Sequence, residues 1–160
     1  MMITIVPAKS EYIESAERIA VAAWTKIHES YKECIGEKMH DDIFKDWEND
    51  KINSVRAGLL SGMGYVALAE NEVAGFISYR VEKDKAVGEI LANAVDEKFR
   101  GLGIGGKMYE FVLSEMKREG VKYAVVNTGL DEGHAPARRA YEKIGFKKNL
   151  PSVKYYMELE

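Results

Sequence analysis

The chain has 160 residues, 46% of them hydrophobic and 31% charged, and a formal net charge of −3. This length fits one domain, residues 1–160, around one core. The small acidic charge excludes a broad basic field for nucleic acid, and no uncharged stretch approaches the roughly 20 residues of a membrane helix. The only cysteine, Cys34, excludes an intramolecular disulfide. We therefore expect a cytoplasmic protein without nucleic-acid or membrane partners.

The N-terminal segment predicts a short strand followed by a long helix. Ile3 and Ile5 alternate with their neighbours before Pro7, which is typical of a strand. Apolar residues then recur at helical spacing over residues 13–34. Gly36 suits the position just past the end of that helix.

The next segment predicts a second helix and three strands. Asp41 or Asp42 is expected to start the helix, and the glycines at 58, 62 and 64 are expected to end it. Short turns separate the three strand-like runs, which indicates an antiparallel meander. These runs are residues 65–70, 73–81 and 86–95.

The last third predicts a parallel crossover and a closing pair of strands. A helix after residue 103 precedes a short apolar run at 123–126, so the strands on either side of the helix should be parallel. A helix over 136–144 and strands over 146–148 and 153–159 follow. The fold class is therefore α/β (α+β), with a mixed, mostly antiparallel sheet of about seven strands flanked by about four helices.

The stretch Arg-Gly-Leu-Gly-Ile-Gly-Gly-Lys at residues 100–107 lies between a strand and a helix. The first-turn N–H groups of a helix lack internal partners, and the helix dipole adds about half a positive charge there. Glycines let a phosphate approach those groups. The stretch thus predicts a phosphate site, although it is also compatible with an ordinary helix start or a nucleotide-binding loop.

Two separated motifs resemble those of one family. Residues 100–105, Arg-x-x-Gly-x-Gly, are similar to the pyrophosphate-binding motif of the GNAT N-acetyltransferases. Residues 137–146, Ala-x₃-Tyr-x₃-Gly-Phe, look like the family's second motif. The expected order of elements matches too, so the resemblance covers nearly the whole chain. It implies the GNAT fold and acetyl-CoA, or another acyl-CoA, as the acyl donor, with dimers common among relatives.

The resemblance implies how the donor would be held. Arg100 would order or neutralise the pyrophosphate site, and the pantetheine would pair with the backbone of Ala94 and Val95 where two strands separate. Asn127 and Thr128 would flank the other side of that gap, unless they are only strand-end structure. Backbone N–H groups for the pyrophosphate would come from Leu102, Gly103, Gly105, Gly106 and Lys107.

The same resemblance implies two catalytic residues. Tyr141 would act as general acid toward the CoA thiolate, because a tyrosine hydroxyl is protonated at neutral pH. Glu89 would act as the base that accepts a proton from the substrate ammonium. Tyr141 packing in a helix face, and Glu89 as a solvated strand residue, are the structural alternatives.

The segment before Tyr141 departs from the family pattern. His134 stands where the family commonly has a CoA-contacting asparagine, and it can contact CoA or lie on the surface. Arg138 could add a phosphate contact, and Ala137 begins the second motif.

The family places the amine acceptor beside the N-terminal helices. Trp24, His28 and Tyr31 share one helix face there and are the predicted acceptor contacts, although aromatic residues in helices are more often core. His28, Cys34, His40 and Asp41 match no ligand spacing, so no metal is expected.

The leading hypothesis is an acetyl-CoA-dependent N-acetyltransferase that transfers the acyl group directly to a small-molecule or peptide amine, as a monomer or a homodimer. Cys34 lies outside both motifs, which argues against an acyl-cysteine step. A non-catalytic acyl-CoA sensor and an adenine-nucleotide or NAD-binding domain are the alternatives.

Overall fold

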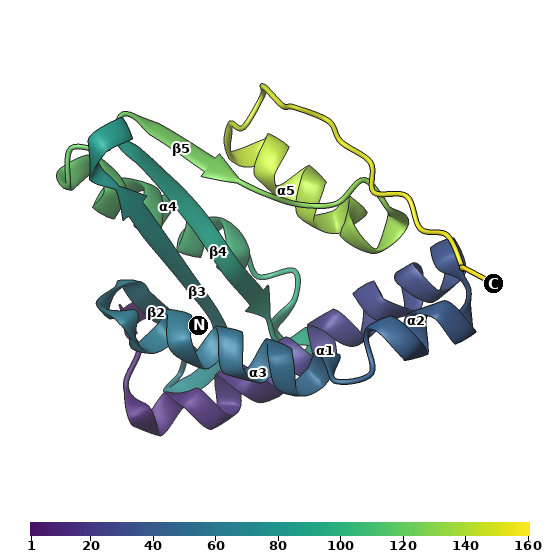
Figure 1. Ribbon diagram of the computed structural model, residues 1–160. Helices are drawn as coiled ribbons and strands as arrows, with labels where there is room; N and C mark the ends of the chain where they lie inside the picture. Colours follow the sequence, from purple (N-terminus) through teal and green to yellow (C-terminus); the bar gives the residue numbers. More distant parts are fainter.

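The computed structural model describes residues 1–160 as one five-stranded sheet with helices on both faces (Figure 1). The strand order in the sheet follows the chain order. The first three pairings are antiparallel and β4 pairs with β5 in parallel, so the predicted meander and crossover are confirmed. The strands are β1 (Ile3–Pro7), β2 (Gly64–Ala69), β3 (Glu72–Glu82), β4 (Val87–Val95) and β5 (Tyr123–Val126).

Five α-helices surround the sheet, where about four were expected. The long first helix ends at Gly36 and the last ends at Gly145, as predicted. None of the helices combines the length and apolar character that crossing a bilayer requires. The helices are α1 (Ser10–Ile35), α2 (Glu37–Ile43), α3 (Trp47–Gly58), α4 (Ile104–Arg118) and α5 (Ala135–Ile144).

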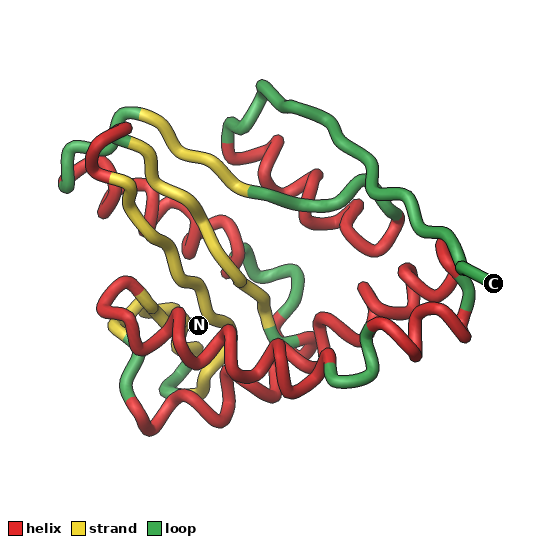
Figure 2. Tube along the Cα trace, viewed as in Figure 1, coloured by secondary structure: helices red, strands yellow, loops and turns green.

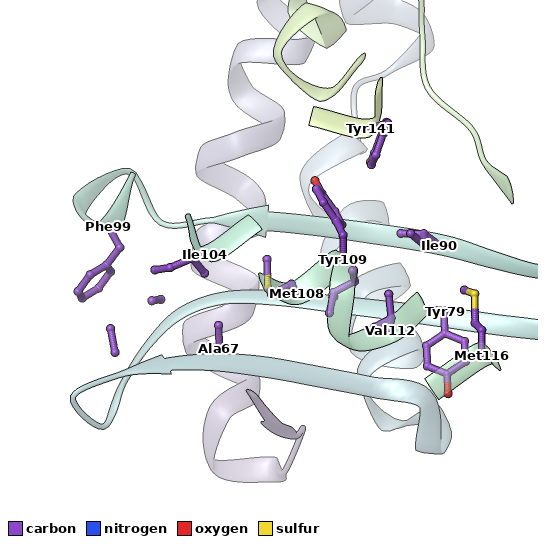
Figure 3. Close-up of a cluster of buried hydrophobic side chains, with 13 residues drawn as sticks. Ala67, Tyr79, Ile90, Phe99, Ile104, Met108, Tyr109, Val112, Met116 and Tyr141 are labelled. Atoms are coloured by element: carbon purple, nitrogen blue, oxygen red, sulfur yellow. The ribbon is translucent and has the colours of Figure 1, made fainter. Parts of the chain in front are cut away.

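Two buried clusters fill the space between the sheet and its helices. One lies between the sheet and α4, where Met108, Val112 and Met116 are almost inaccessible to solvent (Figure 3). The other lies on the opposite face, where α1 and α3 cover Phe76 and Val66. The sheet is therefore a middle layer, with α1 and α3 on one side and α4 and α5 on the other.

The prediction for the second helix was partly wrong. Helical structure resumes at Glu37, directly after Gly36, and breaks at Phe44–Asp46 before α3 begins. The helical turns also continue past Gly58 as an irregular segment to Met63. Apolar spacing over residues 43–59 is continuous across the break, so periodicity alone could not show that two helices share the face.

The two predicted closing strands, 146–148 and 153–159, are wrong. Both segments are extended without pairing, and the sheet has five strands where about seven were expected (Figure 2). Tyr155 and Leu159 carry the alternation expected of a strand, but their side chains are exposed. A strand also needs a backbone hydrogen-bonding partner, and the alternation does not supply one.

The parallel pair β4–β5 holds together for only part of its length. Pairing runs from Val87 opposite Tyr123 to Ile90 opposite Val126 and then stops, while β4 continues to Val95 (Figure 2). A register shift between Ile77 and Tyr79 of β3 marks an irregularity in β4 at the same level. Residues 91–95 of β4 thus keep a free edge toward β5, where the sequence predicted that two strands separate.

Candidate active site

The glycine loop leads from β4 into the N-terminus of α4. Gly101 and Gly103 have φ angles of 78° and 76°, a left-handed conformation that other residues rarely adopt. Gly103 is the N-cap of α4, and the N–H groups of Leu102 and Gly103 make no hydrogen bond within the chain. The N–H groups of residues 104–106 have no helical acceptor either. These free donors lie where the sequence predicted an anion cradle.

The loop's two cations lie at its two ends. The Lys107 N–H already donates to Gly103 O at 3.1 Å, which is the first hydrogen bond of the helix. Of the predicted backbone donors, Lys107 is therefore the one that is not free. The Lys107 side chain is exposed. Arg100 Nη1 lies 3.6 Å from Glu97 Oε1, the same oxygen that Lys26 of α1 approaches at 2.7 Å. Glu97 therefore offsets part of the positive charge beside the cradle.

A cavity of about 230 Å³ lies next to this loop, between α1 and the end of β4. Its lining comes from two segments, α1 (Arg18, Ile19, Ala22, Ala23 and Lys26) and the end of β4 with the turn after it (Val95, Asp96, Glu97 and Arg100).

The gap between β4 and β5 is bordered by unused polar groups. Asn127 is exposed just past the end of β5. The neighbouring Thr128 Oγ1 is buried and has no hydrogen-bond partner. A buried hydroxyl without a partner costs free energy, which a ligand with amide groups in the gap would recover. Ala94 and Val95 lie on the free stretch of β4 opposite.

Tyr141 lies on α5 and points toward β4 from the α4 side of the sheet. Its side chain is 8% exposed, and its ring lies 5.4 Å from that of Tyr109 of α4 (Figure 3). Its Oη accepts a hydrogen bond from Asn93 Nδ2 at 3.0 Å. Burial raises the pKa of the Tyr141 hydroxyl, while its polar neighbours Asn93 and Tyr109 oppose that rise. The hydroxyl therefore stays protonated at neutral pH and can donate.

Glu89 lies in the part of β4 that is still paired with β5, opposite Val125. Its neighbours Gly88 and Ile90 face the α4 cluster, so Glu89 faces the α1 side. Its Oε1 pairs with Arg80 Nη2 at 2.5 Å. Glu89 and Tyr141 thus lie on opposite faces of the sheet, and the ion pair with Arg80 is made by Glu89 Oε1.

A polar junction around Asp131 joins α1 to the segment before α5. Asp131 Oδ2 accepts from Ser30 Oγ at 2.7 Å, and Oδ1 lies 2.5 Å from His134 Nδ1. Burial alone would raise the pKa of Asp131, but these hydrogen bonds outweigh it and lower that pKa. Arg138 Nη1 donates to Gly129 O and Asp131 O.

His134 and Arg138, predicted to contact CoA, therefore already hold the loop after β5. His134 keeps Nε2 for a further partner, and Arg138 keeps its other guanidinium nitrogens. Ala137 is half-buried and packs against the α4 cluster beside Tyr141.

The predicted acceptor residues differ in exposure. His28 is 7% exposed, and its ring is stacked on that of Trp47 with 4.2 Å between the ring centres. His28 Nδ1 lies 2.9 Å from His40 Nε2. Trp24 and Tyr31 are half-buried. Lys51 Nζ lies 4.1 Å from the centre of the Trp24 ring. Only the two half-buried aromatic residues offer surface to a substrate in this conformation.

The histidine pair extends to an acidic residue. His40 Nδ1 lies 2.9 Å from Asp41 Oδ1; since a carboxylate only accepts, His40 Nδ1 is assigned as donor and His40 Nε2 as acceptor from His28. Burial, followed by the charge of His40, lowers the pKa of His28 to about 4. His28 is therefore neutral at pH 7 and packs as part of the helix junction.

Sequence reasoning missed Asn93 and Asp131. Asn93 is the one polar side chain in the run Leu-Ala-Asn-Ala-Val at the end of β4, and that interruption was a usable signal. Its partners Tyr109 and Tyr141 lie 16 and 48 positions away, so nothing local indicated them. Ser30 and Asp131 are 101 positions apart.

The chain therefore has a mixed sheet with one parallel crossover, and a glycine loop whose free N–H groups lie at the N-terminus of α4. The sequence model of the Acetyltransferase (GNAT) family matches residues 21–146. That range is most of the chain, so the chain belongs to the GNAT acetyltransferase family.

One sequence relative agrees with this assignment, and two solved acetyltransferase structures share the fold. The 5-NmdU N-acetyltransferase of Pseudomonas phage PaMx11 is 27% identical over 119 residues, which cover 74% of this chain and 81% of the phage protein. The PaiA N-acetyltransferase of Thermoplasma acidophilum, solved with coenzyme A, has a TM-score of 0.69 at 19% identity over 92% of this chain and 91% of that one. The ribosomal-protein-S18-alanine N-acetyltransferase of Escherichia coli has a TM-score of 0.66 at 17% identity, and the match covers 93% of this chain and 80% of that one.

Proposed function

We propose that this protein transfers the acetyl group of acetyl-CoA to a primary amine by direct attack in a ternary complex. The observation that carries the proposal is the row of free N–H groups at Leu102 and Gly103, which follows the unpaired edge of β4. The cradle suits a pyrophosphate, and the free strand edge suits the amide-bearing arm attached to it.

The residues present fit such a donor. Backbone donors from Leu102 to Gly106 would take the phosphate oxygens, with Arg100 and the Lys107 side chain as nearby cations. The free edge of Ala94 and Val95 would pair with the pantetheine amides, and the partnerless Thr128 hydroxyl and Asn127 would face them from across the gap. When bound, acetyl-CoA supplies the thioester that an amine can attack.

The chain's own residues would then move the protons. Tyr141 Oη would give its proton to the departing sulfur, because its pKa is kept high by burial. Glu89 Oε2 would accept a proton from the ammonium group, directly or through water, while Oε1 remains paired with Arg80. Much of the rate would come from holding the amine and the thioester together.

The acceptor is proposed only as a primary amine that approaches along α1. Trp24 and Tyr31 are the candidate contacts, since their rings are partly exposed and an ammonium group can lie over an aromatic face. The two relatives named for their substrates act on different amines, one on 5-NmdU and one on the alanine of a ribosomal protein. Those names favour an amine and leave its structure open.

Turnover and binding together test the proposal. Purified protein would be incubated with acetyl-CoA and a panel of amines, thiol release followed with a thiol reagent and products identified by mass spectrometry. Calorimetry with CoA, NAD and ATP runs in parallel. We expect CoA to bind more tightly than NAD or ATP and at least one amine to release thiol. Tighter binding of NAD would contradict the proposal.

The non-catalytic sensor is kept as the second candidate because Glu89 is ion-paired with Arg80 and His28 is buried. Both observations reduce the number of free bases near a substrate. Binding of acetyl-CoA without thiol release across peptide, polyamine and nucleobase amines would favour the sensor.

A further inference from the structure

Asn93 lies at the centre of a hydrogen-bond network that joins three elements. Its Nδ2 donates to Tyr141 Oη of α5 and to Leu91 O, each at 3.0 Å. Its Oδ1 accepts from Tyr109 Oη of α4 at 2.9 Å. Both Nδ2 hydrogens and the amide oxygen are thereby used, in a half-buried side chain on the free stretch of β4.

These partners determine which way the amide faces. The reversed amide would bring Oδ1 against Leu91 O, and two acceptors would face each other. Nδ2 is therefore the atom next to Tyr141, and Oδ1 is the atom next to Tyr109. The orientation is assigned from these partners.

The fixed amide makes the two neighbouring tyrosines unequal. Tyr109 gives its hydroxyl hydrogen to Asn93 Oδ1. Tyr141 instead accepts from Asn93 and keeps its own hydroxyl hydrogen for another acceptor. Although both rings are buried and 5.4 Å apart, only Tyr141 is left as a proton donor toward the gap between β4 and β5.

We propose that Asn93 is the positioning residue that turns Tyr141 into a proton donor and stabilises its oxygen once the proton has left. The proposal rests on the proposed acetyl transfer. As the carbon–sulfur bond breaks, the Tyr141 O–H bond breaks and an S–H bond forms, leaving the electron pair on Oη. The Asn93 N–H holds that negative oxygen. The amine nitrogen of the acceptor forms the new bond to the acetyl carbon, and the proton that this amine nitrogen then loses returns to Tyr141 Oη, so no further reactant is needed.

The electrostatic surroundings of Tyr141 agree with this role. Burial raises its pKa, and hydrogen bonding from Asn93 acts in the opposite direction. Tyr109 is the only titratable side chain whose ring packs against Tyr141 and whose hydroxyl joins the network, and burial raises its pKa as well. A hydroxyl buried without the Asn93 donor would be a weaker acid.

The test replaces the donor while keeping its size. Asn93→Asp puts an acceptor where Nδ2 was, so the Tyr141 hydrogen would turn inward to the carboxylate. We expect kcat to fall about 10- to 100-fold, with the KM for acetyl-CoA changed by less than about 2-fold, the range expected for one charge-assisted hydrogen bond. Asn71→Asp, on an exposed turn, is the control for the added charge and should leave kcat unchanged.

A double-substitution cycle separates positioning from general damage. In a Tyr141→Phe background, Asn93→Asp should change kcat by less than about 2-fold, because the group through which it acts is gone. Tyr109→Phe leaves Asn93 in place and removes only its anchor, so kcat should fall about 3-fold. Equal losses from Asn93→Asp with and without Tyr141 would overturn the proposal, as would an unchanged kcat.

A spectroscopic measurement makes the test independent of activity. In protein labelled with ¹³Cζ-tyrosine, Asn93→Asp and Tyr109→Phe should shift the Tyr141 resonance, since that carbon reports the hydrogen bonds of its oxygen. An unmoved Tyr141 resonance would overturn the network even if the enzyme is inactive. Wild-type protein without thiol release, but with a shifted resonance, would reject the acetyl transfer and keep the network.

Discussion

The two sides of the molecule treat their polar groups differently. Around the glycine loop and the gap, donors and acceptors are left unused, including the N–H groups of Leu102 and Gly103 and the hydroxyl of Thr128. At the junction of α1, α2 and α3, the polar side chains bind one another, and His28, His40 and Asp41 form a continuous chain of hydrogen bonds.

This contrast separates a region with unfilled hydrogen-bonding groups from a region whose polar side chains bind one another. The buried Thr128 hydroxyl costs stability unless a ligand completes it, whereas the N–H groups of Leu102 and Gly103 belong to exposed residues and are open to solvent. At the helix junction, His28, His40 and Asp41 satisfy one another's hydrogen-bonding groups and join α1 to α2. In the proposed function, the donor would be recognised through unfilled hydrogen bonds, and the acceptor through shape and the partly exposed rings of Trp24 and Tyr31.

The largest effect expected on the donor side comes from the proposed acid. Tyr141→Phe should lower kcat about 10²- to 10⁴-fold, the usual contribution of a general acid, with little change in the calorimetric Kd of CoA. Tyr79→Phe is the matched control, because that buried tyrosine bonds Glu119 away from the gap. Equal losses of kcat and CoA affinity in Tyr141→Phe would show that the ring only packs or contacts the donor.

At the helix junction we expect an effect of pH on the free energy of unfolding, and His28 is the group that causes it. His28 has a folded pKa of about 4 against an ordinary 6.5, so the unfolded chain binds the extra proton first as pH falls. Stability is complete above pH 6.5 and decreases through pH 4, by roughly 2–3 kcal/mol in total.

Urea unfolding between pH 7 and 4.5 measures this effect. His28→Gln keeps a hydrogen-bond donor but cannot titrate, so its unfolding midpoint should vary less with pH than that of the wild type. A parallel decline in both proteins would assign the acid sensitivity to other groups.

Gly106→Ala should separate folding from binding. An added methyl there meets no atom within 4 Å, and alanine stabilises a helix by up to about 1 kcal/mol relative to glycine. The same methyl would occupy the proposed phosphate space and weaken CoA binding about 10-fold, or about 1.4 kcal/mol. Thermal unfolding and calorimetry measure the two effects.

Ser114→Ala is the control for Gly106→Ala, because Ser114 is exposed in the same helix and lies outside the loop. It should raise the melting temperature without changing CoA affinity. If Gly106→Ala binds CoA as the wild type does, the phosphate does not lie over the first turn of α4.

The smallest effect concerns the charge beside the loop. Glu97→Gln removes the carboxylate that Arg100 and Lys26 share, and should tighten CoA binding about threefold at low salt. The gain should disappear at high ionic strength, because exposed charges are screened. Glu72→Gln, which frees Lys98 instead, should leave CoA affinity unchanged. Weaker binding in Glu97→Gln would mean that Glu97 holds Arg100 in place.

Local signals carried most of what the sequence could predict. The glycines around Gly103, the apolar periodicity of α1 and the short run of β5 act within a few residues, and the structure has these elements where they were expected. The parallel crossover followed from their order. The two closing strands failed because their alternation is local while pairing depends on a distant partner.

The polar networks could not be predicted for the same reason. Asn93 forms hydrogen bonds with Tyr109 and Tyr141, and Asp131 forms one with Ser30. These partners are distant in the sequence and come close only in the folded protein. The motif around Tyr141 indicated that this tyrosine is a candidate site residue. The structure added its neighbour Asn93, which donates a hydrogen bond to the Tyr141 hydroxyl oxygen. Whether His28 faced a ligand or the core depended on Trp47, which lies on another helix.

The junction at Asp131 has a thermodynamic consequence for the whole molecule. Ser30 belongs to the first helix, which packs over β3 and β4, while His134 belongs to the loop that borders the gap. A molecule that binds against α1 and displaces Ser30 removes two hydrogen bonds of that loop, the one from Ser30 Oγ to Asp131 Oδ2 and the one from Gly133 N to Ser30 Oγ. Reciprocity then requires that filling the gap change the affinity of α1 for that molecule by the same factor, so the two binding events share one coupling free energy.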